Sequence, residues 1–135
     1  MSEMTDNAPA PTVWGTFQAR DARAMIDFLV ALGFEATAVY GEGEVVDHAQ
    51  LDWPEGGGVM FGSNKTEGFV LEPGTAGFYV VTDDPHGVHE RAVATGAEII
   101  REMEDADYGS TGFTMRDPEG NKWSFGTYRG EPRKG

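Results

Sequence analysis

The segments PEGGGVMFG (residues 54–62) and PEGNKWSFG (residues 118–126) are two versions of one short pattern. Five of their nine positions are identical, and the second segment begins 64 residues after the first in a chain of 135. Each opens with a Pro-Glu-Gly turn signal and continues into residues of strand character. This repetition at half the chain length indicates two copies of one structural unit.

The helix signals that precede each turn repeat with the same spacing. Asp21 is a helix N-cap and Gly33 a helix stop, and Asp84 and Gly96 stand in the same relation, 12 residues apart in both cases. The predicted elements are strands at 13–19, 35–40, 44–52 and 58–63 with a helix at 22–32, then strands at 76–82, 98–103, 111–116 and 122–128 with a helix at 85–95. The chain is therefore predicted to be a duplicated β-α-β-β-β unit.

The organisation of the chain follows from this repeat. We expect one domain at 13–128, made of a first unit at about 13–63 and a second unit at about 75–128. The linker between them, around 63–75, has no regular period and contains glycine and proline. Residues 1–12 and 129–135 are predicted to be flexible tails.

Charge and composition exclude several classes of protein. The net charge is −13, and residues 13–128 carry all of it, which disfavours nucleic acid and anionic lipid as partners and favours cationic ligands. The same charge is also typical of a protein that is simply soluble. The chain has no cysteine, no apolar run of the ~18 residues that a membrane span needs, and no signal-peptide pattern. We expect a cytoplasmic protein that binds neither nucleic acid nor membrane.

Three stretches of the chain resemble a known family. They are RDARAMIDFLVALGFE, HAQLDWPEGGGVMFGS and DYGSTGFTMRDPEGNKWSFGTY. Together with the paired units they resemble the vicinal oxygen chelate superfamily, which includes glyoxalase I, extradiol dioxygenases, fosfomycin resistance enzymes and bleomycin resistance proteins. The likeness is greatest to its glyoxalase-like, bleomycin-resistance-like branch. It implies an α+β fold in which two tandem βαβββ units form a curved mixed sheet around a cleft, with the helices on the convex side. It also implies a homodimer whose clefts include residues of both chains.

The resemblance supplies a test for a metal site. Metal-using members of the superfamily hold their ion with four ligands on the cleft face, and the family motif maps these onto Trp14, Met60, Gly77 and Ser124. A divalent ion in such a site needs imidazole or carboxylate, which none of these residues provides. We therefore expect no metal and no other cofactor.

Alternation along the strands identifies the residues that face the expected cleft. Ala49 and Leu51 are predicted to pack under the helix, so His48, Gln50 and Asp52 face the cleft. Trp53 and Tyr108 are expected in adjoining loops. Aromatic rings beside carboxylates favour a planar or cationic ligand, and an arginine could instead anchor an anionic group. The predicted ligand-binding residues are Trp14, His48, Gln50, Asp52, Tyr79, Tyr108, Arg116 and Tyr128.

The sequence predicts no catalytic residue together with the partner groups that it would need. His48 is a weak candidate, because Asp52 would lie about 13 Å away along an extended strand. Asp117 and Glu119 fit the first and third positions of a β-turn better than an acid/base pair. The favoured interpretation is a metal-free protein that sequesters a small aromatic or cationic compound, as bleomycin resistance proteins do. The alternatives are a glyoxalase- or dioxygenase-like enzyme with an unrecognised metal site or His48, and a dimeric scaffold without ligand.

Overall fold

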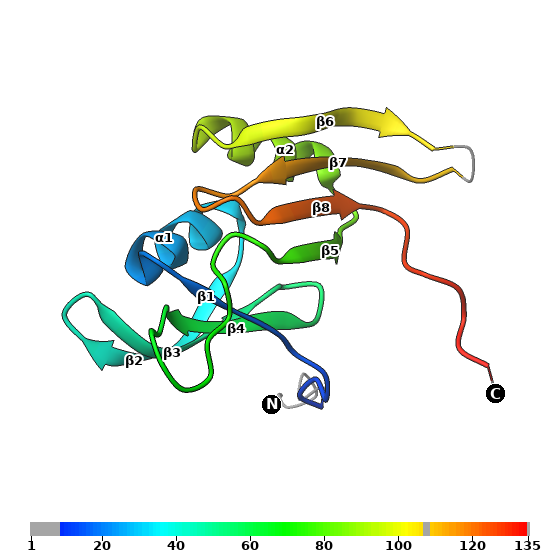
Figure 1. Cartoon of the computed structure of the whole chain (residues 1–135). Coiled ribbons are helices and arrows are strands. Elements are labelled where there is room, and N and C mark those ends of the chain that lie inside the picture. Colours follow the sequence, from blue (N-terminus) through cyan, green and yellow to red (C-terminus); the bar gives the residue numbers. More distant parts are fainter. Residues whose placement is uncertain (1–8, 107–108, 135) are drawn as a thin grey trace, which may run out of the picture.

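The computed structural model describes residues 9–106 and 109–134, and it shows the two units in succession (Figure 1). The first unit contains β1 (Gly15–Ala19), α1 (Ala22–Leu32), β2 (Glu35–Glu42), β3 (Val45–Asp52) and β4 (Gly58–Ser63). The second unit contains β5 (Gly77–Val81), α2 (Pro85–Ala94), β6 (Glu98–Asp105), β7 (Thr111–Arg116) and β8 (Lys122–Gly126). The predicted order of elements is confirmed.

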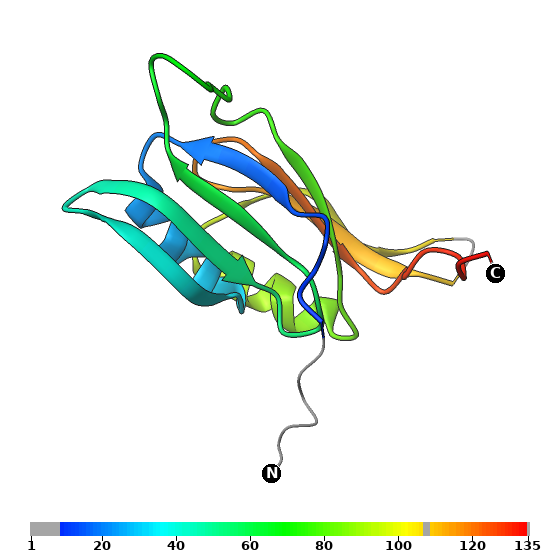
Figure 2. The same ribbon diagram turned by 90° about the horizontal axis from the view of Figure 1, so that it is seen from below.

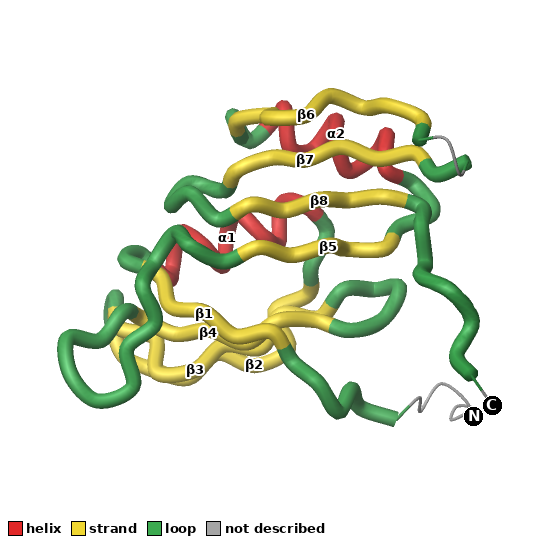
Figure 3. Tube along the Cα trace, turned by 45° about the vertical axis from the view of Figure 1, so that its right-hand side comes forward, coloured by secondary structure: helices red, strands yellow, loops and turns green. Residues whose placement is uncertain are grey.

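Each unit forms its own four-stranded mixed sheet (Figure 3), with strand orders β1-β4-β3-β2 and β5-β8-β7-β6. The first strand of each unit runs parallel to the last, and the remaining neighbours are antiparallel. The registers also repeat, because Thr16 pairs with Met60 in the first sheet and Tyr79 with Ser124 in the second. The predicted α+β class and the two tandem βαβββ units are thus confirmed.

The helix ends follow the capping signals in the sequence. The Asp21 side chain accepts a hydrogen bond from the backbone N–H of Ala24, and the Asp84 side chain accepts one from that of Gly87. Gly33 follows α1 with φ of 126°, a left-handed conformation that favours glycine. None of the helices among the described residues is long and apolar enough to cross a membrane.

The apolar faces of both sheets and both helices form one core. The helices contact each other and lie against the strands (Figure 2). Phe17 in β1 stacks on Phe61 of its own sheet, with ring centroids 4.6 Å apart. It also meets two rings of the second unit edge-on, Phe78 at 5.4 Å and Trp123 at 6.3 Å. The face of each sheet that points away from this core is called its open face below.

The repeated Pro-Glu-Gly turns lock the two units together. In the second unit's turn, the Glu119 carboxylate accepts hydrogen bonds from the backbone N–H groups of Arg20 at 2.6 Å and Asp21 at 2.8 Å, just before α1. In the first unit's turn, Glu55 accepts one from the N–H of Asp83 at 2.9 Å, just before α2. Each turn therefore holds the start of the other unit's helix, which is a structural reason for the same turn to occur twice.

Candidate functional site

The open face of the first unit carries the predicted group of His48, Gln50 and Asp52. Their side chains are partly exposed, while Ala49 and Leu51 between them are fully buried. The Gln50 amide donates to the Asp52 carboxylate at 3.1 Å. The structure therefore gives these strand residues the orientation that alternation predicts.

His48 has an aromatic neighbour that sequence reasoning missed. Its ring stacks with that of Tyr40, which lies opposite it on β2, with centroids 6.2 Å apart and planes inclined by 16°. Tyr40 is 62% exposed, so this ring pair is accessible from solvent. The pairing depends on the β2–β3 register, which a β-bulge near Tyr40 shifts and which the sequence does not reveal.

A depression of about 230 Å³ adjoins His48 on this face. Met60 and Gly62 line it from β4, and the linker contributes Lys65 and Phe69.

Gln18 on β1 fixes the linker beside this depression. Its buried amide nitrogen donates to the Phe69 carbonyl at 2.8 Å. Its amide oxygen accepts from the backbone N–H groups of Lys65 and Leu71 and from the side chain of Asn64. The linker is therefore a fixed wall of the first unit's open face.

The second unit carries the other candidates. The Tyr79 hydroxyl donates to the Tyr128 carbonyl at 2.7 Å, and the Tyr128 hydroxyl donates to Glu131 at 3.1 Å. Arg116 forms an ion pair with Glu98 at 3.1 Å. A depression of about 180 Å³ beside Tyr79 is lined by second-unit residues, including Arg101 and Glu104.

The candidates thus fall into two groups, one on each unit. The depression beside His48 is lined by the first unit and the linker, and the one beside Tyr79 by the second unit. Trp14 precedes β1 and is partly buried, with its ring close to the backbone of Gly58. Tyr108 lies outside the described residues. Trp53 lies in the expected loop directly after β3, and its ring is 6% exposed and packs against Phe34 in the core between the units.

Some members of the superfamily that this chain resembles hold a metal ion at four positions. The residues at these positions in this chain do not provide metal ligands. Ser124 lies on β8 with its hydroxyl 2.7 Å from that of Thr114, and Met60 lies on β4. Thioether, hydroxyl, indole and a bare glycine backbone do not form a divalent-metal ligand set. Within residues 9–106 and 109–134, no cluster of three or more His, Asp or Glu side chains could hold an ion.

The two carboxylates of the second turn have structural partners. Asp117 is 5% exposed and accepts hydrogen bonds from the side chains of Asn121 and Trp123 and from two backbone N–H groups. Glu119 accepts the bonds that cross between the units. These contacts agree with the interpretation of the segment as a turn.

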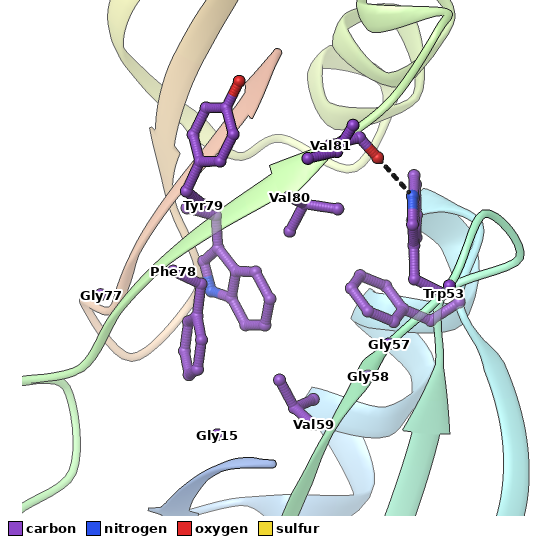
Figure 4. A pocket seen from close by; sticks show the side chains of 13 residues that line it. Gly15, Trp53, Gly57, Gly58, Val59, Gly77, Phe78, Tyr79, Val80 and Val81 are labelled. Carbon is purple, nitrogen blue, oxygen red and sulfur yellow. Dashed lines mark hydrogen bonds between the residues drawn. The ribbon is translucent and has the colours of Figure 1, made fainter. Parts of the chain in front are cut away.

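A larger cavity lies where the two units meet, between β4 and β5 (Figure 4). It has a volume of about 390 Å³ and is partly open to solvent, and its lining consists of glycines, valines and aromatic residues. Trp53, Val59, Phe78 and Val80 surround this space in Figure 4, whereas the ring of Tyr79 points away from it. This space is called the seam cavity below. Sequence reasoning missed it, because it depends on how the units pack.

Comparison with known proteins places the chain in a family. Residues 13–125 match the model of the Glyoxalase/Bleomycin resistance protein/Dioxygenase superfamily. Curated protein sequences contain no significant match.

Several solved structures share the fold. TioX from Micromonospora sp. ML1 is 24% identical, with a TM-score of 0.68 over 84% of this chain and 97% of that one. UcmS2 is 16% identical, with a TM-score of 0.69 over 90% of this chain and 100% of that one. A glyoxalase / bleomycin resistance protein from Catenulispora acidiphila DSM 44928 is 22% identical, with a TM-score of 0.62 over 84% of this chain and 95% of that one. The family model covers most of the chain, so this protein belongs to the glyoxalase/bleomycin resistance protein/dioxygenase superfamily.

Proposed function

We propose that this protein is a metal-free binding protein that sequesters a planar aromatic ligand, preferably a cation. The observation that carries the proposal is that two half-sites with exposed aromatic rings lie on the open faces of the two units. One half-site is centred on His48 and Tyr40, and the other on Tyr79. The residues at the family's metal positions support binding without an ion, because they offer no imidazole or carboxylate.

The charge of the whole protein favours a positive charge on the ligand, whereas Lys65 and a carboxylate both line the depression of the first half-site. Asp47 lines the depression beside His48, and Asp52 lies further along the same strand. The net charge of −13 would raise the local concentration of a cation at low ionic strength. A flat cation that stacks on the exposed rings would gain cation–π stabilisation of about 0.5–2 kcal/mol per contact.

The two half-sites would be joined by a second copy of the chain. In a dimer with two-fold symmetry, the first unit of one copy can face the second unit of the other, which creates two equivalent sites. The family resemblance supports this arrangement, because relatives commonly form dimers with shared clefts. Tyr79, with 49% of its surface exposed, would then complete the aromatic wall opposite His48.

A thermal-shift screen tests the binding function. We expect an acridine-type cation at saturating concentration to raise the melting temperature by several degrees, and a neutral or anionic analogue to raise it less. The substitutions His48→Ala and Tyr79→Ala should each reduce the shift. His86→Ala is the matched control, because His86 is exposed on α2, away from both half-sites.

Two outcomes would contradict the proposal. One is an unchanged shift in both His48→Ala and Tyr79→Ala, which would place the ligand elsewhere. The other is about one equivalent of a transition metal per chain in elemental analysis, with ligand binding lost after chelation.

A further inference from the structure

The seam cavity lies apart from both open faces. Val59, Phe78 and Val80 project from the core-facing sides of β4 and β5, opposite to the sides that carry Met60 and Tyr79. A molecule in this cavity would therefore contact the aromatic core between the two units and would not contact His48.

The first repeated turn contributes its three glycines, Gly56, Gly57 and Gly58, to the lining of the cavity. In the repeat, Gly57 corresponds to Asn121 and Val59 to Trp123, and both second-unit residues are almost fully buried. The Asn121 side chain accepts a hydrogen bond from the backbone N–H of Ala76 at 3.0 Å, which ties this turn to the strand beside it. The larger second-unit residues thus pack into their surroundings, while glycine and valine leave space in the first unit.

The walls of the seam cavity are held in place by contacts between the units. The Trp53 indole N–H donates to the Val81 carbonyl at 2.9 Å, shown as a dashed line in Figure 4. The backbone of Trp53 bonds twice across its own turn, to Gly56 and Gly57. Glu55 in the same turn holds the N–H of Asp83. A ligand would thus meet an aromatic wall that is already ordered, which lowers the entropic cost of binding.

We propose that the seam cavity is a second ligand site, which binds a small, flat and electrically neutral aromatic molecule. Burial of a charge among glycines, valines and aromatic rings would be costly, because these side chains offer no counter-charge. A volume of about 390 Å³ lies within the range of known small-molecule sites. Rings such as those of Trp53 and Phe78 favour a planar partner. The expected ligand therefore differs in charge from the cation proposed for the open faces.

The test uses two probes of similar shape in the full-length protein, neutral naphthol and cationic naphthylmethylammonium. Methyl resonances of Val59, Val80 and Val81 report on the seam cavity, and the imidazole resonances of His48 report on the open face. We expect naphthol to shift the valine methyl groups. The cation should leave those methyl groups unchanged, whatever it does at His48, so a failure of the open-face proposal can be told apart from a failure of this one.

A space-filling variant sharpens the test. Val80→Trp should weaken naphthol binding roughly tenfold or more, because the added ring occupies the cavity. Val93→Trp is the matched control, since it adds the same ring at a position on α2 that is 55% exposed. Should Val80→Trp fail to fold, the methyl shifts of the unmodified protein still decide the question.

Three results would overturn the proposal. The first is the absence of naphthol-induced shifts at the three valines. The second is unchanged naphthol affinity in a folded Val80→Trp variant. The third is a change in the valine resonances with protein concentration in the absence of probe, which would mean that a second copy of the chain covers the cavity.

Discussion

The two repeated turns have the same outline but different interiors. In the second unit, the carboxylate of Asp117 organises the turn with four hydrogen bonds, and Trp123 fills the space behind it. In the first unit, Trp53 stands at the position of Asp117, and a run of three glycines follows the glutamate. The side chain of Asp117 therefore bonds to residues of its own unit, whereas the side chain of Trp53 bonds to the Val81 carbonyl of the other unit.

The two turns share one contact between the units and differ in the residues that surround it. Both turns keep a glutamate that holds the other unit's helix start, Glu55 toward Asp83 and Glu119 toward Arg20 and Asp21. The residues that follow each glutamate differ, and a cavity forms beside the first turn, whereas the second turn is closed by large side chains. The contact between each glutamate and the other unit is therefore compatible with different packing beside the two turns.

The largest expected effect on stability comes from the residues at one pair of corresponding positions, Trp123 and Val59. Trp123→Ala should lower the free energy of unfolding by about 3–5 kcal/mol, because it removes a fully buried ring from the junction of the units. Val59→Ala at the corresponding position should cost only about 2 kcal/mol, because it removes a much smaller side chain. Urea unfolding of both variants checks the order, and equal losses would contradict the asymmetry.

The next largest effect on stability is expected at the corresponding positions that begin the two turns, Asp117 and Trp53. Asp117→Asn should cost about 3 kcal/mol, since an amide cannot accept from both the Asn121 and Trp123 side chains while it serves two backbone groups. The counterpart Trp53→Phe should cost about 2 kcal/mol, because it removes one hydrogen bond to the Val81 carbonyl and part of a buried ring. Thermal unfolding monitored by circular dichroism compares them. A costlier Trp53→Phe would show that the first turn is the more dependent on its organising residue.

The two glutamates that contact the other unit should differ by a smaller amount in their contributions to the free energy of unfolding. Glu119→Ala should cost about 2 kcal/mol, because its carboxylate accepts two backbone hydrogen bonds and its side chain is 9% exposed. Glu55→Ala should cost about 1 kcal/mol, because this side chain is 32% exposed and accepts one such bond. Amide exchange of Arg20 and Asp83 measures the local effect, and faster exchange at the variant's own target amide is expected. Unchanged exchange at both amides would contradict the role of the two glutamates in holding the units together.

Most of the fold could be predicted from the sequence because its signals are local. The caps Asp21 and Asp84, the stop at Gly33 and the alternation around His48 each reflect a few neighbouring residues. The Glu119 contact could not be predicted, because it joins groups almost 100 residues apart that meet only when the units pack. The burial of Trp53 could not be predicted for the same reason, since it depends on Phe34 and on the second unit.

The candidate site was predicted less completely than the fold. Strand alternation identified His48 and Gln50, but not the stacked Tyr40 on the neighbouring strand. Gln18 carried no distinguishing signal, because its role as the anchor of the linker arises only from tertiary contacts.

The proposal of a shared ligand site is tested most directly by mixing two variants that each bind the ligand weakly. His48→Ala removes a first-unit group, and Tyr79→Ala a second-unit group. If each site joins the first unit of one copy to the second unit of the other, random exchange of subunits should restore roughly one quarter of the wild-type binding sites, because each mixed dimer has one intact site. Isothermal titration of the mixture with the acridine-type cation counts these sites. Recovery near one quarter would agree with the account, and a mixture that binds no better than its two components would contradict it.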